Sequence, residues 1–312
     1  MSEQLRFGLI GAAAYVAPRH MQAIRDTGNV LSVALDPHDS VGILDHYSIE
    51  CEYFSEPERF QRYLYLQKRL GKPIDWISVC SPNYLHDAHC QMALWNGADV
   101  ICEKPLCLTP RNLDALSQLE QDTGRRVYTV LQLRLHEAVK QLKASLNGTM
   151  HDVDLTYVTS RGPWFARSWK GDEKRSGGHI ANIGIHFLDV LLWLFGGCEH
   201  VEVHYRDDKR TSGHLRLDRA TVRWFLSVSR DDVPEDVMGP TYRSMSVDGN
   251  EVEFSQGFEK LHTETYAETL AGRGLGIEDA RPSVELSDTI RNLETSAVSR
   301  WDHAHPMVDR YV

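Results

Sequence analysis

A lysine between a glutamate and a proline follows an apolar run of this chain, in the segment Asp99-Val100-Ile101-Cys102-Glu103-Lys104-Pro105. The apolar residues predict a buried strand, and ligands of open α/β sheets bind beyond the carboxyl ends of the strands. Lys104 is therefore placed to meet a substrate, with Glu103 beside it to orient it. A lone lysine in a turn is more often a surface residue, so this interpretation depends on other residues that converge on the same edge.

A second group of candidate catalytic residues lies in the segment 176–186, where paired glycines precede an apolar helix. Such glycines let the backbone pack closely against a ligand. Asn182 and His186 are four residues apart, which places both on one face of the start of the helix. Histidine is the side chain best suited to moving a proton near neutral pH, so His186 is a candidate base. A lone helical histidine is more often structural, so the catalytic interpretation of His186 depends on the other motifs of the chain.

The first predicted strand leads into a loop of the kind that binds dinucleotides. Gly11 ends the strand, and Ala13, Tyr15 and Val16 lie in the loop that would approach a pyrophosphate at the positive end of the next helix. Alanines replace two glycines of the usual fingerprint, so the loop alone leaves a structural turn open. Asp36 ends the second strand, where its carboxylate can accept hydrogen bonds from the adenosine ribose or cap a helix. Because that charge would repel a 2′-phosphate, NAD is favoured over NADP.

A further strand ends at Ser81-Pro82-Asn83, whose backbone would face the same cofactor at the start of a helix. We add Ser81, Pro82, Asn83 and His86 to the predicted cofactor-binding residues, together with Glu103 and Lys104. His86 and His89 could form a metal pair, being three residues apart. No carboxylate or thiolate stands at a matching spacing, so no metal is predicted.

Strand and helix signals alternate through the first 130 residues, which predicts a doubly wound parallel sheet covered on both faces. After residue 131 alternating polar and apolar segments indicate a large, mostly antiparallel sheet with an open face. The sequence thus predicts an α/β protein of two domains. Residues 1–130 form a Rossmann domain that binds NAD, and residues 131–312 form an α+β domain for substrate binding and oligomerisation. An open sheet face could pair with a second copy, so a homo-oligomer, either a dimer or a tetramer, is expected.

Composition restricts the partners. The formal net charge is −10 and the 34 Lys and Arg residues are scattered, which argues against nucleic acid and anionic membrane surfaces. No apolar run reaches the roughly 20 residues of a membrane span. The chain enters its first strand without a signal sequence, and its 6 cysteines lack the paired spacings of a zinc site. A cytoplasmic location is expected.

Taken together, these motifs resemble the Gfo/Idh/MocA family of nicotinamide-dependent sugar oxidoreductases. The resemblance is carried by Asp36, Ser81-Pro82-Asn83 with His86, Glu103-Lys104-Pro105, and the segment from Gly177-Gly178 to His186. Family members commonly have an aspartate where this chain has Asn182, so the resemblance leaves His186 and Lys104 to do the chemistry. It also implies a cis peptide bond between Lys104 and Pro105.

Further segments resemble the WlbA/WbpB branch of that family; they are residues 11–20, 35–37, 83–89, 131–136, 159–162 and 169–172. This branch oxidises the sugar 3-hydroxyl of UDP-N-acetylglucosaminuronic acid to a 3-keto sugar nucleotide. The product serves the synthesis of bacterial surface polysaccharides such as the O-antigen of lipopolysaccharide. Some members reoxidise bound NADH with 2-oxoglutarate, whereas others release it.

Such a substrate carries a carboxylate and two phosphates, so an acidic protein needs local cations to bind it. The predicted substrate-binding residues are Lys104, Arg134, Arg161, Trp169, Lys170, Asn182 and His186. Two alternatives stay open. One is a dehydrogenase of the same family that acts on another sugar or a polyol, and the other is a dinucleotide-binding regulator without turnover.

Overall fold

The computed structural model describes residues 4–252, 257–296 and 303–311. The chain divides into two compact units, and the first consists of Met1–Gln132 and Glu259–Arg281. The second consists of Leu133–Phe258 and Pro282–Val312. The sequence analysis assigned everything after residue 130 to the second domain. The structure instead returns residues 259–281 to the first unit.

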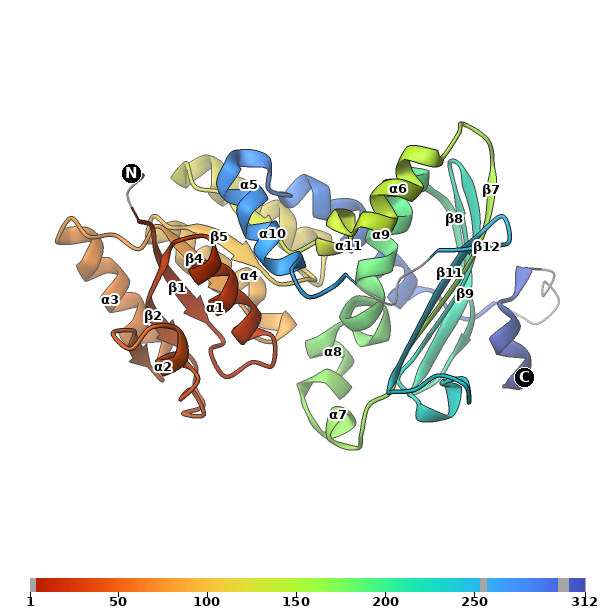
Figure 1. Ribbon diagram of the computed structural model, residues 1–312, viewed down its shortest axis with the longest axis horizontal. Helices are drawn as coiled ribbons and strands as arrows, with labels where there is room; N and C mark the ends of the chain where they lie inside the picture. Colours follow the sequence, from red (N-terminus) through yellow and green to blue (C-terminus); the bar gives the residue numbers. More distant parts are fainter. Residues whose placement is uncertain (1–3, 253–256, 297–302, 312) are drawn as a thin grey trace. The chain divides into compact units, whose positions relative to one another are not determined.

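The first unit contains a parallel sheet of six strands in the order β3-β2-β1-β4-β5-β6 (Figure 1). Its strands are β1 (Arg6–Ile10), β2 (Val30–Leu35), β3 (Glu52–Phe54), β4 (Trp76–Val79), β5 (Asp99–Cys102) and β6 (Val127–Thr129). The central strands are apolar and buried on both faces, as expected when helices cover both sides of a sheet. The predicted Rossmann sheet is confirmed.

The helices of this unit are α1 (Ala17–Asp26), α2 (Leu44–Tyr47), α3 (Pro57–Arg69), the 3₁₀ turn η1 (Asn83–Leu85), α4 (His86–Trp95), α5 (Pro110–Thr123) and α10 (Leu261–Glu268), which continues as a π turn (Thr269–Arg273). Proline stands in the first turn of α1, α3 and α5, where its missing N–H costs no hydrogen bond.

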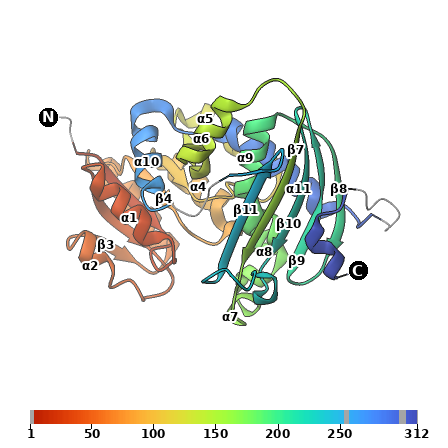
Figure 2. The ribbon, with the colours of Figure 1, turned by 45° about the vertical axis from the view of Figure 1, so that its right-hand side comes forward.

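Helix α10 is the return segment, and it lies beside α1 (Figures 1 and 2). Its Tyr266 is fully buried, with the ring 5.9 Å from that of Phe7 in β1. Beyond α10, the backbone N–H of Thr129 donates to the carbonyl of Leu275 at 2.8 Å. Residues distant in sequence thus complete the core of the first unit.

The second unit contains a mixed sheet in the order β12-β11-β7-β10-β9-β8, in which only the pair β7 and β10 is parallel. Its strands are β7 (His151–Thr159), β8 (Cys198–Arg206), β9 (Arg210–Leu217), β10 (Ala220–Ser227), β11 (Thr241–Val247) and β12 (Asn250–Glu251). The predicted mostly antiparallel character is confirmed.

Strand β9 is one that the sequence analysis did not predict. Leu215 and Leu217 lie on one face of the strand, and Thr211 and Gly213 precede them on the same face. The first half of the strand therefore lacks the apolar residues that would reveal it. Gly213 is required there, because a Cβ would lie 2.0 Å from the carbonyl oxygen of Glu202. Alternation in the sequence also predicts a strand over 251–254, of which residues 253–254 lie outside the described residues.

The helices of this part of the chain are η2 (Gln132–Leu135), α6 (Glu137–Ser145), α7 (Trp164–Arg167), η3 (Trp169–Gly171), α8 (Glu173–Ser176), a π turn (Ile180–Gly184), α9 (Ile185–Phe195), η5 (Arg230–Asp232), α11 (Ile277–Asn292) and η8 (Pro306–Arg310). The helical stretch Glu173–Phe195 is long and apolar enough to cross a membrane, yet 78% of its most apolar part is buried inside the fold. It has the burial of a core helix.

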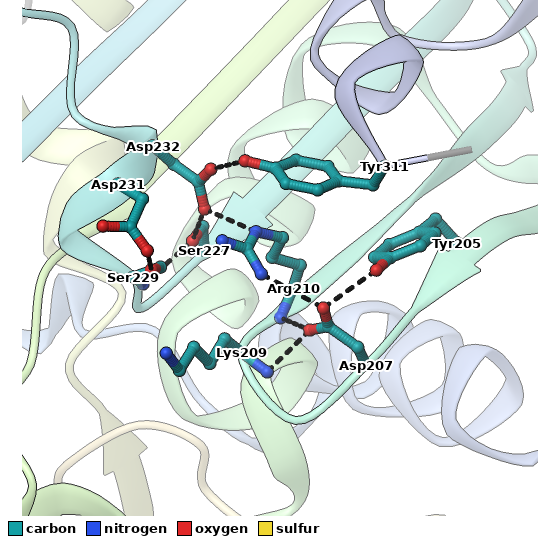
Figure 3. Close-up of polar contacts among 9 residues, drawn as sticks. All are labelled: Tyr205, Asp207, Lys209, Arg210, Ser227, Ser229, Asp231, Asp232 and Tyr311. Carbon is teal, nitrogen blue, oxygen red and sulfur yellow. Dashed lines mark hydrogen bonds and ion pairs between the residues drawn. The ribbon is translucent and has the colours of Figure 1, made fainter.

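A buried cluster around Asp232 anchors the end of the described chain to the second sheet (Figure 3). The Asp232 carboxylate is fully buried and accepts hydrogen bonds from Arg210 Nε at 2.8 Å and from the hydroxyls of Ser227 and Tyr311. The Arg210 guanidinium also lies 4.1 Å from the centre of the Tyr311 ring and donates to Asp207. A single carboxylate therefore connects β9, β10 and the C-terminal segment.

We expect Asp232→Ala to lower the free energy of unfolding by about 3 kcal/mol, because it leaves the Arg210 charge without its buried partner. Asp236→Ala is the matched control: this nearby acid is exposed, so its loss should change stability by less than about 0.5 kcal/mol. Urea unfolding at an unchanged slope measures both. Equal stability of the two variants would contradict the anchoring role.

Candidate active site

Four of the predicted motifs lie along the carboxyl edge of the parallel sheet. Gly11, Asp36, Ser81 and Glu103 follow β1, β2, β4 and β5, which are adjacent in the order β2-β1-β4-β5. Because parallel strands have their carboxyl ends at one edge of the sheet, the predicted cofactor-binding residues and the Glu103-Lys104 segment lie at the same edge of one unit.

Gly11 allows the first loop to approach the end of β4. Its N–H donates to the carbonyl of Leu35 at 2.8 Å, and its φ of +90° lies in a region that favours glycine. A Cβ at this position would lie 2.7 Å from the backbone of both Cys80 and Ser81. The glycine is thus required by close packing as well as by conformation.

Asp36 holds the loop from the neighbouring strand. One carboxylate oxygen accepts from the N–H of Ala13 at 2.9 Å and the other from the N–H of His38 at 2.8 Å. Each carboxylate oxygen has a second lone pair, so acceptor capacity remains for ribose hydroxyls. Tyr15 is 93% exposed and Val16 is half-buried at the start of α1. This cradle fits a dinucleotide.

His86 connects the end of β4 to the turn after β5. Its ring is buried, with one nitrogen 2.7 Å from the carbonyl of Pro105 and the other 2.8 Å from that of Ser81. Burial lowers the pKa of His86, while the two carbonyls act in the opposite direction. Because both ring nitrogens contact the backbone, the side chain shapes the segment; a direct contact of His86 with the cofactor stays a prediction.

Glu103 is buried and carries more contacts than the sequence indicated. Its carboxylate lies 2.9 Å from Nε2 of His20 in α1 and 3.0 Å from Nε2 of His262 in α10. Burial alone would raise the pKa of Glu103, but hydrogen bonds from the two histidines hold it well below its usual value. Lys104 follows in a half-buried position, and its peptide bond to Pro105 is cis, as the family resemblance implied.

His20, His262 and Tyr266 also lie at this edge, and the motifs in the sequence did not predict them. A signal was present for His20, which stands on the buried face of α1 between Ala17 and Ile24. A histidine among apolar residues of one helix face needs a buried polar partner. The identity of that partner could not be read from the sequence, because Glu103 is 83 residues away.

In the second unit, Asn182 and His186 lie where a π turn meets α9. Asn182 is buried within Ile180–Gly184, and His186 is half-buried in the first turn of the helix. Gly177 and Gly178 precede them with φ of +78° and +67°. Widened π turns are frequent at functional sites.

The predicted substrate-binding cations differ in their surroundings. Arg134 forms a two-point ion pair with buried Asp189, at 3.0 Å and 2.6 Å, so that its charge is largely compensated. Arg161 is exposed, and the Lys170 ammonium lies 4.1 Å from the centre of the Trp169 ring. A contact between any of these residues and a substrate stays a prediction.

The fold and this edge define a two-domain oxidoreductase with an NAD-binding Rossmann domain. Residues 5–131 match the family model described as "Oxidoreductase family, NAD-binding Rossmann fold", and residues 148–236 match the corresponding "C-terminal alpha/beta domain". The chain belongs to the Gfo/Idh/MocA oxidoreductase family.

Solved structures and curated proteins resemble the chain to different extents. It is 48% identical to the WlbA (WbpB) dehydrogenase from Thermus thermophilus, with 97% of this chain and 100% of that chain covered. The TM-score is 0.95 for the complex of that enzyme with NAD and alpha-ketoglutarate and 0.94 for its complex with NAD and UDP-GlcNAcA. D-glucoside 3-dehydrogenase of Escherichia coli is 32% identical over 130 residues, which are 39% of this chain and 36% of that protein. The match to such curated relatives spans little more than a third of their length.

We expect Gly11→Ala to weaken NAD binding at least about tenfold, or about 1.4 kcal/mol, because the added Cβ would push the loop away from β4. Gly28→Ala is the matched control. Gly28 has a similar φ of +78°, but a Cβ there would meet nothing within 4 Å. Titration of NAD should therefore give wild-type affinity for Gly28→Ala. Equal weakening in both variants would show that backbone strain, not close approach, is responsible.

Proposed function

We propose that this protein oxidises UDP-N-acetylglucosaminuronic acid with NAD, converting the sugar 3-hydroxyl to a ketone. The observation that carries the proposal is the similarity over 97% of the chain to the Thermus thermophilus dehydrogenase bound to NAD and UDP-GlcNAcA. The 3-keto sugar nucleotide would enter the synthesis of a bacterial surface polysaccharide such as the O-antigen of lipopolysaccharide. We place the reaction in the cytoplasm and expect the working enzyme to be a dimer or a tetramer.

The residues have distinct roles in this proposal. NAD supplies the hydride acceptor, held by the Gly11 loop, Asp36 and the segment from Ser81 to Asn83. His186 removes the hydroxyl proton, directly or through Lys104. Lys104 donates a hydrogen bond to the reacting oxygen and stabilises its developing negative charge.

Recognition of the sugar nucleotide falls to the second unit and to Lys104. Asn182 would position the sugar, and the cations predicted for the carboxylate and the diphosphate are Arg134, Arg161 and Lys170. The exposed guanidinium of Arg161 is better suited to a new ion pair than that of Arg134, which already faces Asp189. Trp169, with Lys170 over its ring, offers a flat surface for sugar or uracil.

We propose 2-oxoglutarate as the acceptor that reoxidises NADH in place. The support is the similar Thermus thermophilus enzyme, whose structure contains alpha-ketoglutarate with NAD. Mass spectrometry of ligand released from the purified protein, together with an assay for 2-oxoglutarate reduction, separates recycling from release of NADH.

A second candidate function is the oxidation of another sugar at the same carbon. It is favoured by the partial match to D-glucoside 3-dehydrogenase, which lies at 32% identity over 130 residues. Assays of NAD reduction with glucosides and with UDP-sugars distinguish the two. A regulator that only binds dinucleotide would reduce no NAD with any of them.

We expect Lys104→Ala and His186→Asn each to lose at least about a hundredfold in kcat while NAD binding stays normal, because each removes a proton-handling group. Steady-state turnover and NAD titration measure the two effects. Near-normal turnover of either variant would remove the role given to that residue.

We also expect UDP-N-acetylglucosamine, which lacks the carboxylate, to show a kcat/KM about tenfold to a hundredfold lower than the acid. Arg161→Ala should lower kcat/KM for the acid and leave that for UDP-N-acetylglucosamine unchanged. Arg216→Ala removes the same charge from strand β9 and serves as the control. Equal use of both substrates by the wild type would refute recognition of the carboxylate.

A further inference from the structure

Five side chains of the first unit form a continuous buried network that ends on Glu103. The hydroxyl of Ser78 lies 2.5 Å from that of Tyr266, and the Tyr266 hydroxyl lies 2.8 Å from Nδ1 of His20. Nε2 of His20 and Nε2 of His262 lie 2.9 Å and 3.0 Å from the same oxygen, Oε1 of Glu103. All five residues are buried. The members come from β4, α1, α10 and the turn after β5.

One assignment of protons gives every one of these hydrogen bonds a donor and an acceptor, with donation running from Ser78 toward Glu103. An ionised carboxylate only accepts, so both Nε2 atoms must donate to Glu103. Burial lowers the pKa of His20, so its Nδ1 carries a lone pair that accepts from Tyr266. Burial also raises the pKa of Tyr266 well above its usual value and keeps its hydroxyl protonated. Ser78 then donates to Tyr266, which completes the series.

His262 fits the same arrangement. Its Nδ1 is buried and has no hydrogen-bond partner among the residues that the structure describes. A proton on that nitrogen would be a buried donor without an acceptor, which is costly. Nε2 of His262 therefore carries a proton, and Glu103 accepts hydrogen bonds from both histidines.

A metal ion is the competing explanation, since His20, Glu103 and His262 all carry ligand atoms within 4.8 Å of one another. Zinc would need each ligand atom about 2.0–2.2 Å from itself and a fourth ligand. The two nitrogens instead lie at ordinary hydrogen-bond distances from one oxygen. Hydrogen bonding accounts for the geometry without an ion.

We propose that Glu103 is a positioning residue, kept ionised and fixed by His20 and by the return-segment histidine His262, and that it thereby sets the backbone that presents Lys104. The other carboxylate oxygen, Oε2, accepts from the Lys104 N–H at 3.3 Å, and the Glu103 N–H donates to the carbonyl of Val79 at 2.9 Å. The inference rests on the proposed function, because it assigns Lys104 to catalysis. It gives one residue of helix α10, His262, a part in positioning Lys104.

The charge of Glu103 makes the proposal testable by pH. Besides the two histidines, the titratable groups that feel its charge among the described residues are His86 of α4, Tyr266, and the thiols of Cys80 and Cys102. Removing a donor raises the pKa of the carboxylate, so Glu103 becomes protonated at a higher pH. One lost hydrogen bond to a charged group corresponds to about one to two pKa units.

The experiment compares His262→Phe, which removes the donor, with His262→Gln, which retains an N–H donor on a chain of similar reach. His262→Phe should lower kcat about tenfold with KM for NAD unchanged, and the loss relative to the wild type should grow as the pH is lowered toward the raised pKa of Glu103. His262→Gln should recover most of the turnover. Thr265→Val is the matched control, because it removes a buried hydroxyl of α10 that donates to the carbonyl of Leu261 within the same helix. A wild-type pH profile for His262→Phe would overturn the proposal.

A second measurement needs no substrate and so separates this proposal from the proposed function. In urea unfolding, the double variant Glu103→Gln with His262→Phe should lose less stability than the sum of the two single variants, because each single change breaks the same hydrogen bond. Additive losses would overturn the network even if the wild type is active. Stabilisation of the wild type by Zn²⁺, absent in His262→Phe, would establish the metal site instead.

Discussion

The carboxylate of Glu103 is the group on which the arrangement of the first unit depends. It is buried at the end of β5, where a charge is costly unless it is hydrogen-bonded. Its donors come from α1, near the start of the chain, and from α10, which the chain reaches only after passing through the second unit. Satisfying one anion therefore requires that the return segment be in place, which explains why a Rossmann domain here includes residues 259–281.

The same edge carries the predicted cofactor-binding residues and the proposed catalytic Lys104, connected by short covalent and hydrogen-bonded paths. Gly11 packs on the backbone after β4, Asp36 holds the Gly11 loop, and His86 connects Ser81 to Pro105. The close packing of Gly11 and the hydrogen bonds of the Asp36 and His86 side chains thus connect these segments. This arrangement suits an oxidoreductase, in which the positions of the hydride acceptor and of the proton-handling groups must be set together.

The second unit follows a different principle. Its mixed sheet carries polar residues on one face, and a single carboxylate, Asp232, connects two strands to the C-terminal segment (Figure 3). Helix α9, preceded by a π turn, lies buried and carries His186 at its start. The second unit thus holds the proposed catalytic histidine at the start of a buried helix, together with exposed or half-buried cations that include Arg161 and Lys170.

Local patterns in the sequence were sufficient to determine the parallel sheet apart from the short strand β3, most of its helices, and the strand ends that carry Gly11, Asp36, Ser81 and Glu103. These features depend on periodicity and turn residues within some ten to twenty positions. Strand β9 was not predicted from the sequence, because Thr211 and Gly213 stand where the alternating pattern needs apolar residues. The pairing of Glu103 with His20 and His262, the ion pair of Arg134 with Asp189 and the return of α10 were decided only by the tertiary structure. Each of these contacts joins residues that are far apart in the chain. A buried charge needs a partner, but the sequence does not identify which residue that partner is.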